Sequence, residues 1–178
     1  LYDTPAGIDT TQERMPFERE IRIEGLSFHF DDAPDRDILH DLSLTIRKGE
    51  RIGIRGASGV GKTTLFNILL GFYRPTAGRI TIDGRPLDET NLRKWQNTIG
   101  YVSQSVFIAD SSFMQNVALG CAPDRIDRRR AAQALETAKL KEFIDTLPQG
   151  METPIGECGC RLSGGQRQRL GIARALYK

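Results

Sequence analysis

Residues 56–63 constrain this chain more than any other stretch. Their sequence is Gly-Ala-Ser-Gly-Val-Gly-Lys-Thr, which fits the pattern G-x-x-x-x-G-K-[ST] of a phosphate-binding loop. A short apolar run at residues 51–55 precedes the loop and predicts a buried strand. Apolar residues follow the loop at the spacing of one helix face: Leu65, Ile68, Leu69 and Phe72. Strand, glycine loop and helix thus come in the order that a nucleotide site requires, and we predict that the chain binds a nucleotide.

The chemistry of a triphosphate explains the residue types of this loop. Its many charged oxygens need backbone N–H groups, which glycines allow to turn inward, and the positive end of a helix dipole. Lys62 adds a point charge for the outer phosphates, and the Thr63 hydroxyl can ligate Mg²⁺. A glycine-rich turn with a surface lysine is the alternative, and the flanking pattern argues against it. The nucleotide-binding residues predicted here are Gly56, Ser58, Gly59, Val60, Gly61, Lys62, Thr63 and Thr64.

The bulk composition excludes several classes of protein. The chain has 178 residues, with 25 Lys and Arg against 23 Asp and Glu, so its net charge is +2. This length suits one domain, or one domain and a linker. So balanced a charge gives no strong field for nucleic acid or an anionic membrane. No apolar run approaches the ~20 residues of a membrane helix, and the N-terminus does not resemble a signal peptide.

The cysteines are few and odd in number. Cys158 and Cys160 could supply two metal ligands, but neither Cys121 nor the only histidines, His29 and His40, completes a second pair beside them. Reduced thiols in a cytosolic protein are therefore the favoured interpretation.

The first half of the chain predicts a linker followed by strands. Residues 1–18 contain prolines, a glycine and no periodicity, so we expect a linker, and a chain that opens on Leu1 is expected to be part of a longer polypeptide. Alternating apolar residues from 20 to 30 predict a strand with a β-bulge at Glu24-Gly25. A second alternating run, residues 42–46, predicts an antiparallel partner. The pair leads into the run at 51–55, which indicates an α/β sheet.

The second half is predicted to be mainly helical. Residues 79–84 predict a short strand and residues 87–95 a weak helix, before another strand at 99–103 that ends on Gln104. Helical periodicity then runs from 124 to 147.

Three consecutive arginines, residues 128–130, form a basic patch. Asp124 and Asp127 lie beside it, and no aromatic residues are interleaved. A solvated helix face is therefore favoured over a nucleic-acid site.

A second informative stretch, residues 162–166, has the sequence Leu-Ser-Gly-Gly-Gln. Ser163 stands where a helix N-cap is expected, and Leu170, Ala173 and Tyr177 give the following helix an apolar face. A hydroxyl, two glycine N–H groups and a helix N-terminus make another anion site. Since the first loop already binds one nucleotide, the second site is predicted to serve a nucleotide held elsewhere.

With both motifs in hand, the chain closely resembles the nucleotide-binding domain of ABC transporters, the exporter branch in particular. LSGGQ is the signature sequence of that family, and the resemblance covers about residues 17–178. It implies an α/β fold: a P-loop NTPase core with an N-terminal antiparallel β subdomain and an inserted helical subdomain, incomplete at the C-terminus. The implied divisions are a linker from a preceding membrane domain (1–18) and the nucleotide-binding domain (19–178), made of the β subdomain and core (19–104), the helical subdomain (105–160) and the signature loop and helix (161–178).

The resemblance also implies roles for particular residues. Phe30 falls where the family places an aromatic that stacks on adenine, and it keeps the π face of the usual Tyr. Gln104 matches the Q-loop glutamine, which touches Mg²⁺ and the attacking water. Residues 153–157 resemble the X-loop, which relays motion to the membrane part, and residues 1–5 resemble the linker of an exporter. Lys62 and Gln104 are then catalytic, and Thr63 and Gln104 are the metal ligands. Four signature residues are expected to contact the nucleotide of a partner domain: Ser163, Gly164, Gly165 and Gln166.

Two departures from the family qualify these expectations. Arg55 replaces a small or apolar residue, so a buried strand end would carry a charge. The family segment that follows the signature helix holds the Walker B strand, the catalytic Glu, the D-loop and the switch His, and neither His29 nor His40 lies where that histidine could be. Because Gln104 is a poor base, the chain is expected to bind ATP but to hydrolyse it poorly.

The function implied by the resemblance is that of the ATP-binding motor domain of an ABC-type exporter. Its cofactors are ATP and Mg²⁺. Its partners are a second nucleotide-binding domain, in a homodimer or pseudo-dimer, and a transmembrane domain in the same polypeptide, with no nucleic acid. It would work as an ATP hydrolase at the cytoplasmic face of a membrane. A soluble ABC-type ATPase acting on DNA or ribosomes would lack the linker, and a small-molecule kinase would leave LSGGQ unexplained.

Overall fold

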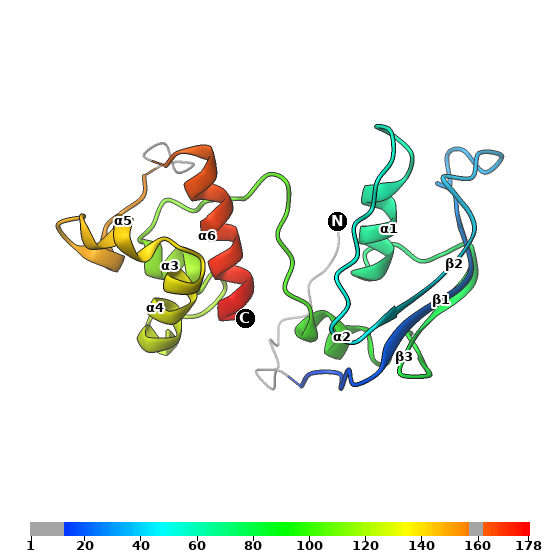
Figure 1. Cartoon of the computed structure of the whole chain (residues 1–178), viewed down its shortest axis with the longest axis horizontal. Coiled ribbons are helices and arrows are strands. Elements are labelled where there is room, and N and C mark those ends of the chain that lie inside the picture. The colour runs from blue at the N-terminus through cyan, green and yellow to red at the C-terminus, as the bar shows by residue number, and fades with distance from the viewer. Residues whose placement is uncertain (1–12, 157–161) are drawn as a thin grey trace. The chain divides into compact units, whose positions relative to one another are not determined.

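A computed structural model describes residues 13–156 and 162–178. The chain divides into two compact units, one ending at Ile99 and the other beginning at Gly100 (Figure 1). The linker motif at residues 1–5, Glu157 of the predicted X-loop, and Cys158 and Cys160 lie outside the described residues.

The first unit is built on an antiparallel sheet. Its strands are β1 (Glu20–Phe28), β2 (Leu39–Arg47), β3 (Ala77–Ile82) and β4 (Arg85–Pro86), in the order β2-β1-β3-β4 (Figure 1). The register slips between Ile23 and Leu26 of β1, where Gly25 has a φ of 59°. Such a conformation suits glycine, and the extra residue twists the strand locally. The predicted β subdomain and its bulge are confirmed.

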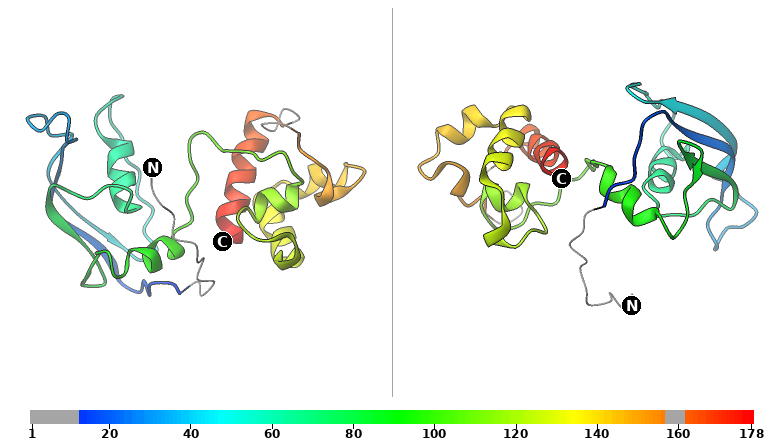
Figure 2. Two further views of the ribbon diagram at one scale, coloured as in Figure 1. Left: turned by 180° about the vertical axis from the view of Figure 1, so that it is seen from behind. Right: turned by 90° about the horizontal axis from the view of Figure 1, so that it is seen from below.

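Two helices complete the first unit, α1 (Lys62–Leu69) and α2 (Leu92–Thr98) (Figure 2). Leu65 and Ile68 of α1 lie in one hydrophobic cluster with Trp95 of α2. Trp95 also donates a hydrogen bond from Nε1 to the carbonyl of Leu69, 2.7 Å away, so its only polar atom is satisfied in the core. Met15, which precedes β1, and buried residues of β1 and β3 supply the rest of this cluster: Ile23, Leu26, Phe28, Ile80 and Ile82. The sheet and α1 therefore share one core.

Two predicted strands do not form. Residues 51–55 and 99–103 belong to no β-ladder in the part of the chain that the structure describes. Ile52 is 45% exposed and Tyr101 48% exposed. An apolar run supplies only side chains for a core, whereas a strand also needs a neighbour that pairs its backbone groups. Because this strand is absent, Arg55 is exposed, and the expectation of a buried charge there is wrong.

Two element ends also differ from the predictions. The helix after the phosphate loop ends at Leu69, and the chain then turns at Gly71, whose φ is 72°. Phe72, predicted on the apolar face, is 61% exposed as a result. The first strand ends at Phe28, so Phe30 lies in the loop that follows and not in the ladder.

The second unit is helical. Its elements are α3 (Phe113–Val117), η1 (Pro123–Arg125), α4 (Arg128–Thr137), α5 (Lys141–Asp145), η2 (Gly150–Glu152) and α6 (Gly164–Tyr177). Helix α6 packs against α3 and α4, and Figure 2 shows the three together in both views. The region predicted as helical from 124 to 147 is interrupted at Lys139, whose φ of 59° is incompatible with a continuous helix. This turn separates α4 from α5.

The basic patch of α4 is exposed and bound to its own unit. Arg128 forms an ion pair with Glu152, and the guanidinium of Arg130 lies 5.3 Å from the centre of the Tyr177 ring. The Tyr177 hydroxyl accepts a hydrogen bond from the backbone N–H of Asp127 at 3.0 Å. The contacts with Tyr177 tie the start of α4 to the end of α6, and the ion pair with Glu152 ties it to η2. All three arginines are exposed on this helix face.

No described helix has the length and apolar character needed to cross a membrane. Within residues 13–156 and 162–178, no cluster of three or more His, Cys, Asp or Glu side chains is placed to hold a metal ion. Cys121 is a free, exposed thiol.

Candidate nucleotide-binding site

The phosphate loop ends in a glycine-capped helix. Gly61 is the N-cap of α1, with φ 93° and ψ 6°, and no side chain caps this end of the helix. A Cβ at Gly61 would lie 3.0 Å from the carbonyl oxygen of Ile38, so both the backbone conformation and the space require glycine. The first N–H groups of a helix have no partner within it. The N-terminus of α1 is therefore a place where an anion is favoured.

Lys62 lies over this loop. Its Nζ donates hydrogen bonds to the carbonyl oxygens of Gly56 (2.8 Å) and Ala57 (2.6 Å). A Cβ at Gly56 would come within 2.7 Å of a methyl group of Val60, so close packing of the loop on itself explains the first glycine. Carbonyls are neutral acceptors, and a phosphate oxygen would make a stronger, charge-assisted bond to the same ammonium group. The structure thus places the Lys62 ammonium group at the loop, and its role toward a phosphate stays a prediction.

The predicted adenine-stacking residue lies in the same unit. Phe30 is 39% exposed, whereas Phe28 is only 6% exposed and belongs to the core. Ile38 connects this aromatic end of β1 to the loop: its N–H donates to the carbonyl of Phe28 at 2.8 Å, and its own carbonyl lies beside Gly61. Of the two phenylalanines, Phe30 is the one with an open surface for a base.

The signature stretch caps a second helix. Ser163 is the N-cap of α6, as predicted: its hydroxyl accepts from the N–H of Gln166 (3.3 Å), and the Gln166 side-chain oxygen accepts from the N–H of Ser163 (2.8 Å). This reciprocal pair is a capping box. A Cβ at Gly164 would meet nothing within 4 Å, and one at Gly165 only the guanidinium of Arg169, at 3.9 Å. Nothing within the described unit requires glycine at these two positions.

Gln104 belongs to the second unit. Its carbonyl accepts a hydrogen bond from the side chain of Gln168 on α6 at 3.2 Å, and its own side chain is exposed. Close packing holds this segment on the helix, since a Cβ at Gly171 would lie 2.8 Å from a methyl group of Val106. Thr63 is exposed and belongs to the first unit. The magnesium site that Thr63 and Gln104 are predicted to share therefore stays a prediction.

A family model described as ABC transporter matches residues 39–178. The chain belongs to the ABC transporter family.

Similarity to individual proteins extends over all of this chain. It is 41% identical to an ATP-dependent lipid A-core flippase of Bordetella avium and 44% identical to one of Ralstonia nicotianae, each match covering 100% of this chain and 30% of the relative. A solved structure of a bacterial Atm1-family ABC exporter with ATP bound is 34% identical, with a TM-score of 0.82 over 99% of this chain and 30% of that one. The chain thus spans about 30% of the length of these relatives. The predicted family and fold class are confirmed, and membership of this family implies that the chain binds ATP.

The predicted X-loop of the ABC domain is attached to α3. Residues 153–156 run beside the segment before that helix: Pro154 bridges Ser112, and the N–H of Ile155 donates to the carbonyl of Ser111 at 3.0 Å. Ile155 is 1% exposed, so the segment is anchored in the core of the second unit.

Sequence reasoning missed the polar centre of the second unit. Asn116 of α3 is fully buried, and its side chain exchanges hydrogen bonds with both backbone groups of Ala109, at 2.9 and 3.0 Å. Arg174 of α6 donates to the carbonyls of Asn116 and Phe107, each at 2.9 Å, and burial lowers the pKa of this guanidinium. One signal for α3 was available, because its capping box, Ser112-x-x-Gln115, repeats the pattern of the signature helix.

Proposed function

We propose that this chain is the ATP-binding motor domain of an ABC-type exporter. The observation that carries the proposal is the N-terminus of α1, which is capped by Gly61 in a left-handed conformation and covered by Lys62. That arrangement suits a nucleotide phosphate, and the similarity to an exporter and to flippases favours transport over the DNA- or ribosome-linked ATPases considered above.

ATP binding then follows from the residues of the first unit. The ammonium group of Lys62 leaves the two loop carbonyls and pairs with the outer phosphates, while the N–H groups at the start of α1 donate to them. The exposed surface of Phe30 stacks on the adenine ring. Binding thus uses a charged end at the loop and an apolar end at the aromatic, which together orient the nucleotide.

Magnesium is the metal that we propose to accompany the nucleotide. The Thr63 hydroxyl of the first unit and the Gln104 side-chain oxygen of the second are each a hard oxygen ligand of the kind that Mg²⁺ prefers, and the ion would neutralise charge on the phosphates. The two residues to which we assign catalytic roles, Lys62 and Gln104, include no carboxylate to deprotonate water. We therefore propose slow ATP turnover by this chain alone and full hydrolysis in the complete transporter.

We further propose that the working unit holds two such domains head to tail. Ser163, Gly164, Gly165 and Gln166 of one domain then approach the phosphate held by the loop of the other. The relatives are about three times as long as this chain, which is consistent with a transmembrane domain in the same polypeptide and a position at the cytoplasmic face of a membrane.

The nucleotide site is tested by titration calorimetry with ATP and Mg²⁺. Lys62→Ala removes the loop's ammonium group and is expected to weaken ATP binding by about 1.5–3 kcal/mol. Lys48→Ala is the matched control, because it removes the same charge from the exposed turn after β2. Equal affinities for the wild type and Lys62→Ala would overturn the assignment, as would an equal loss in both variants.

The head-to-tail arrangement makes a separate prediction. Gly165→Asp is expected to leave the ATP affinity of the monomer almost intact, because Gly165 lies in the second unit, whereas the loop that binds the monomer's own nucleotide lies in the first. In a longer chain that carries the predicted Walker B strand and a neutralised catalytic Glu, the same change would place a carboxylate against the partner's phosphate. ATP-driven dimers should then disappear in size-exclusion chromatography. A variant that still dimerises, or one that loses ATP binding as a monomer, contradicts the arrangement.

A further inference from the structure

Three aromatic rings meet at the predicted base-binding surface. The rings of Phe28 and Tyr73 are stacked, with centroids 5.4 Å apart and an interplanar angle of 12°. The Phe30 ring stands nearly perpendicular to both, at 84° and 5.0 Å from Phe28 and at 85° and 5.7 Å from Tyr73. Edge-to-face geometry of this kind is favourable and directional. The orientation of Phe30 is thus set by two neighbours.

The two supporting rings differ in their attachment. Phe28 is 6% exposed and ends β1, so its ring is part of the sheet core. Tyr73 is 37% exposed and comes from the segment directly after α1. The backbone N–H groups of Phe72 and Tyr73 donate to the carbonyl of Asn67 on α1, at 2.8 and 3.4 Å. Tyr73 therefore connects the helix that begins at the phosphate loop to the ring predicted to receive the base.

We propose that Tyr73 is a positioning residue for adenine: it fixes the Phe30 ring with its open surface toward the base, and it acts only through Phe30. This inference rests on the proposed function, in which Phe30 stacks on ATP. A side chain that is 39% exposed has rotamer freedom to lose when a base binds. A ring held in advance loses less of this freedom on binding, so affinity rises without any contact between Tyr73 and the nucleotide.

The ring of Tyr73, and not its hydroxyl, carries this role. In the part of the chain that the structure describes, the Tyr73 hydroxyl makes no hydrogen bond, whereas its ring contacts both phenylalanines. Phenylalanine should therefore replace it. Phe72 provides a matched control, because it is the adjacent aromatic residue, is 61% exposed and makes no ring contact among the described residues.

The test compares MgATP with inorganic triphosphate plus Mg²⁺ as ligands of the whole chain, by calorimetry. Tyr73→Ala and Tyr73→Leu should each weaken ATP binding about two- to fivefold, no more than Phe30→Ala does, and leave triphosphate affinity unchanged. Tyr73→Leu keeps an apolar side chain, which guards against a variant that fails to fold. Tyr73→Phe should restore the wild-type ratio of the two affinities, and Phe72→Ala should not alter it.

A double variant decides whether the effect passes through Phe30. In a Phe30→Ala background, Tyr73→Ala should cause no further loss of ATP affinity. A further loss would mean direct contact with the nucleotide, and an equal loss for triphosphate would mean a merely structural role; either result overturns the inference. If Phe30→Ala lowers ATP affinity but Tyr73→Ala does not, the inference fails alone. If the wild type binds ATP no better than triphosphate, the proposed base site itself fails.

Discussion

The helices α1 and α6 both begin at glycine-rich motifs, but their N-termini are capped differently. The cap of α1 is Gly61, which offers no side chain, and the ammonium group of Lys62 is bonded to two carbonyls of the loop. The cap of α6 is Ser163, whose hydroxyl and N–H are both engaged with Gln166. One N-terminus is open to an anion and carries its own cation, whereas the other is already capped from within.

This difference suggests different roles for the two helix N-termini. The unpaired N–H groups of α1 and the nearby lysine can stabilise a bound nucleotide without any group from another molecule. A helix N-terminus that is already capped is stabilised less by an added anion. Gly164 and Gly165 have no close neighbours on the Cβ side except the Arg169 guanidinium, so they leave space for a phosphate that is bound to a partner domain. The comparison therefore favours α1 as the primary ATP site and α6 as the surface that meets a nucleotide held by a partner.

Exchanging glycine for alanine at each helix start tests this contrast and should give the largest effect. Gly61→Ala places a Cβ at φ 93° and 3.0 Å from the Ile38 carbonyl, which should cost about 1–3 kcal/mol. If the loop distorts to relieve this strain, ATP binding falls about five- to 150-fold. Gly164→Ala meets nothing and should change stability by less than about 1 kcal/mol, in the stabilising direction. Chemical denaturation and ATP titration of both variants check the pair; similar behaviour at the two sites would remove the distinction.

Removing the cap of α6 should give the next largest effect. Ser163→Ala breaks the capping box and is expected to destabilise the second unit by about 0.5–2 kcal/mol, while Ser163→Asn retains an N-cap and should stay near the wild type. ATP affinity should not change in either variant, because the nucleotide loop lies in the first unit. Urea unfolding with parallel ATP titrations measures both quantities. A loss of ATP affinity in Ser163→Ala would show that the signature acts on the chain's own nucleotide.

The two motifs also show what could be predicted from sequence. The Gly61 conformation, the Ser163 cap and the bulge at Gly25 are local features, set by a few adjacent residues whose side-chain chemistry is readable. The run at 51–55 is different, because its strand depends on a backbone partner that a local pattern cannot supply. Its residues are apolar, yet Ile52 is 45% exposed and no ladder includes it.

Long-range polar contacts lay beyond sequence reasoning for a similar reason. Asn116 and Arg174 are separated by 58 residues and meet because α3 and α6 pack together. A lone asparagine and a lone arginine carry no signal of that pairing. The exposure of Phe30 was likewise decided by where β1 stops, since continued alternation would have made it a ladder residue.

The predicted base contact should have a smaller effect than the changes at the helix starts. Phe30→Ala is expected to weaken ATP binding by about 1 kcal/mol, and Phe30→Tyr should be nearly neutral, because the π face is kept. Thermal melts measured beside the titrations separate stacking from folding. If Phe30→Ala loses much stability but binds ATP normally, Phe30 is a structural residue and the open surface has another use.

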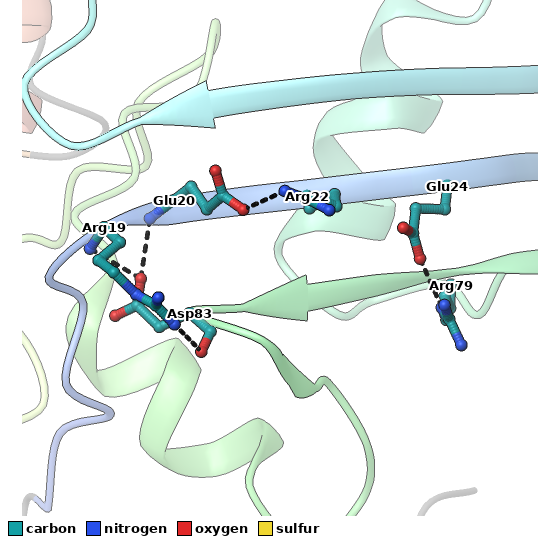
Figure 3. A network of polar contacts seen from close by, with 6 residues as sticks. All are labelled: Arg19, Glu20, Arg22, Glu24, Arg79 and Asp83. Carbon is teal, nitrogen blue, oxygen red and sulfur yellow. Dashed lines mark hydrogen bonds and ion pairs between the residues drawn. The ribbon is translucent and has the colours of Figure 1, made fainter.

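A third set of backbone N–H groups, at the start of β1, is occupied by the protein's own carboxylate. Asp83 follows β3, and its side chain accepts a hydrogen bond from the N–H of Glu18 at 2.6 Å. It also accepts from the N–H groups of Arg19 (2.7 Å) and Glu20 (2.8 Å), while the Arg19 guanidinium donates to the Asp83 carbonyl (Figure 3). The bond from Glu18, those from Glu20 and Arg19, and the charge of Arg19 lower the pKa of Asp83 from its usual 3.8, against a partial opposing effect of desolvation. At this place a carboxylate of the chain itself accepts from the backbone N–H groups.

Low pH should therefore weaken the attachment of residues 18–20 to Asp83, and this should be the smallest of the effects predicted here. Because the folded pKa of Asp83 is lowered, its contribution to stability is present above the unfolded value of 3.8 and is lost as pH falls through the folded pKa. Asp83→Asn should lower stability slightly at neutral pH and flatten the decline below about pH 4. The pKa of Asp88 is also lowered, by hydrogen bonds from Thr90, but Asp88 is present in both the wild type and Asp83→Asn and contributes the same pH dependence to each. Asp35→Asn, in the exposed loop after β1, is the control. Urea midpoints measured from neutral pH down to about pH 3 check this; parallel curves for Asp83→Asn and the wild type would mean that the carboxylate does not hold the segment before β1.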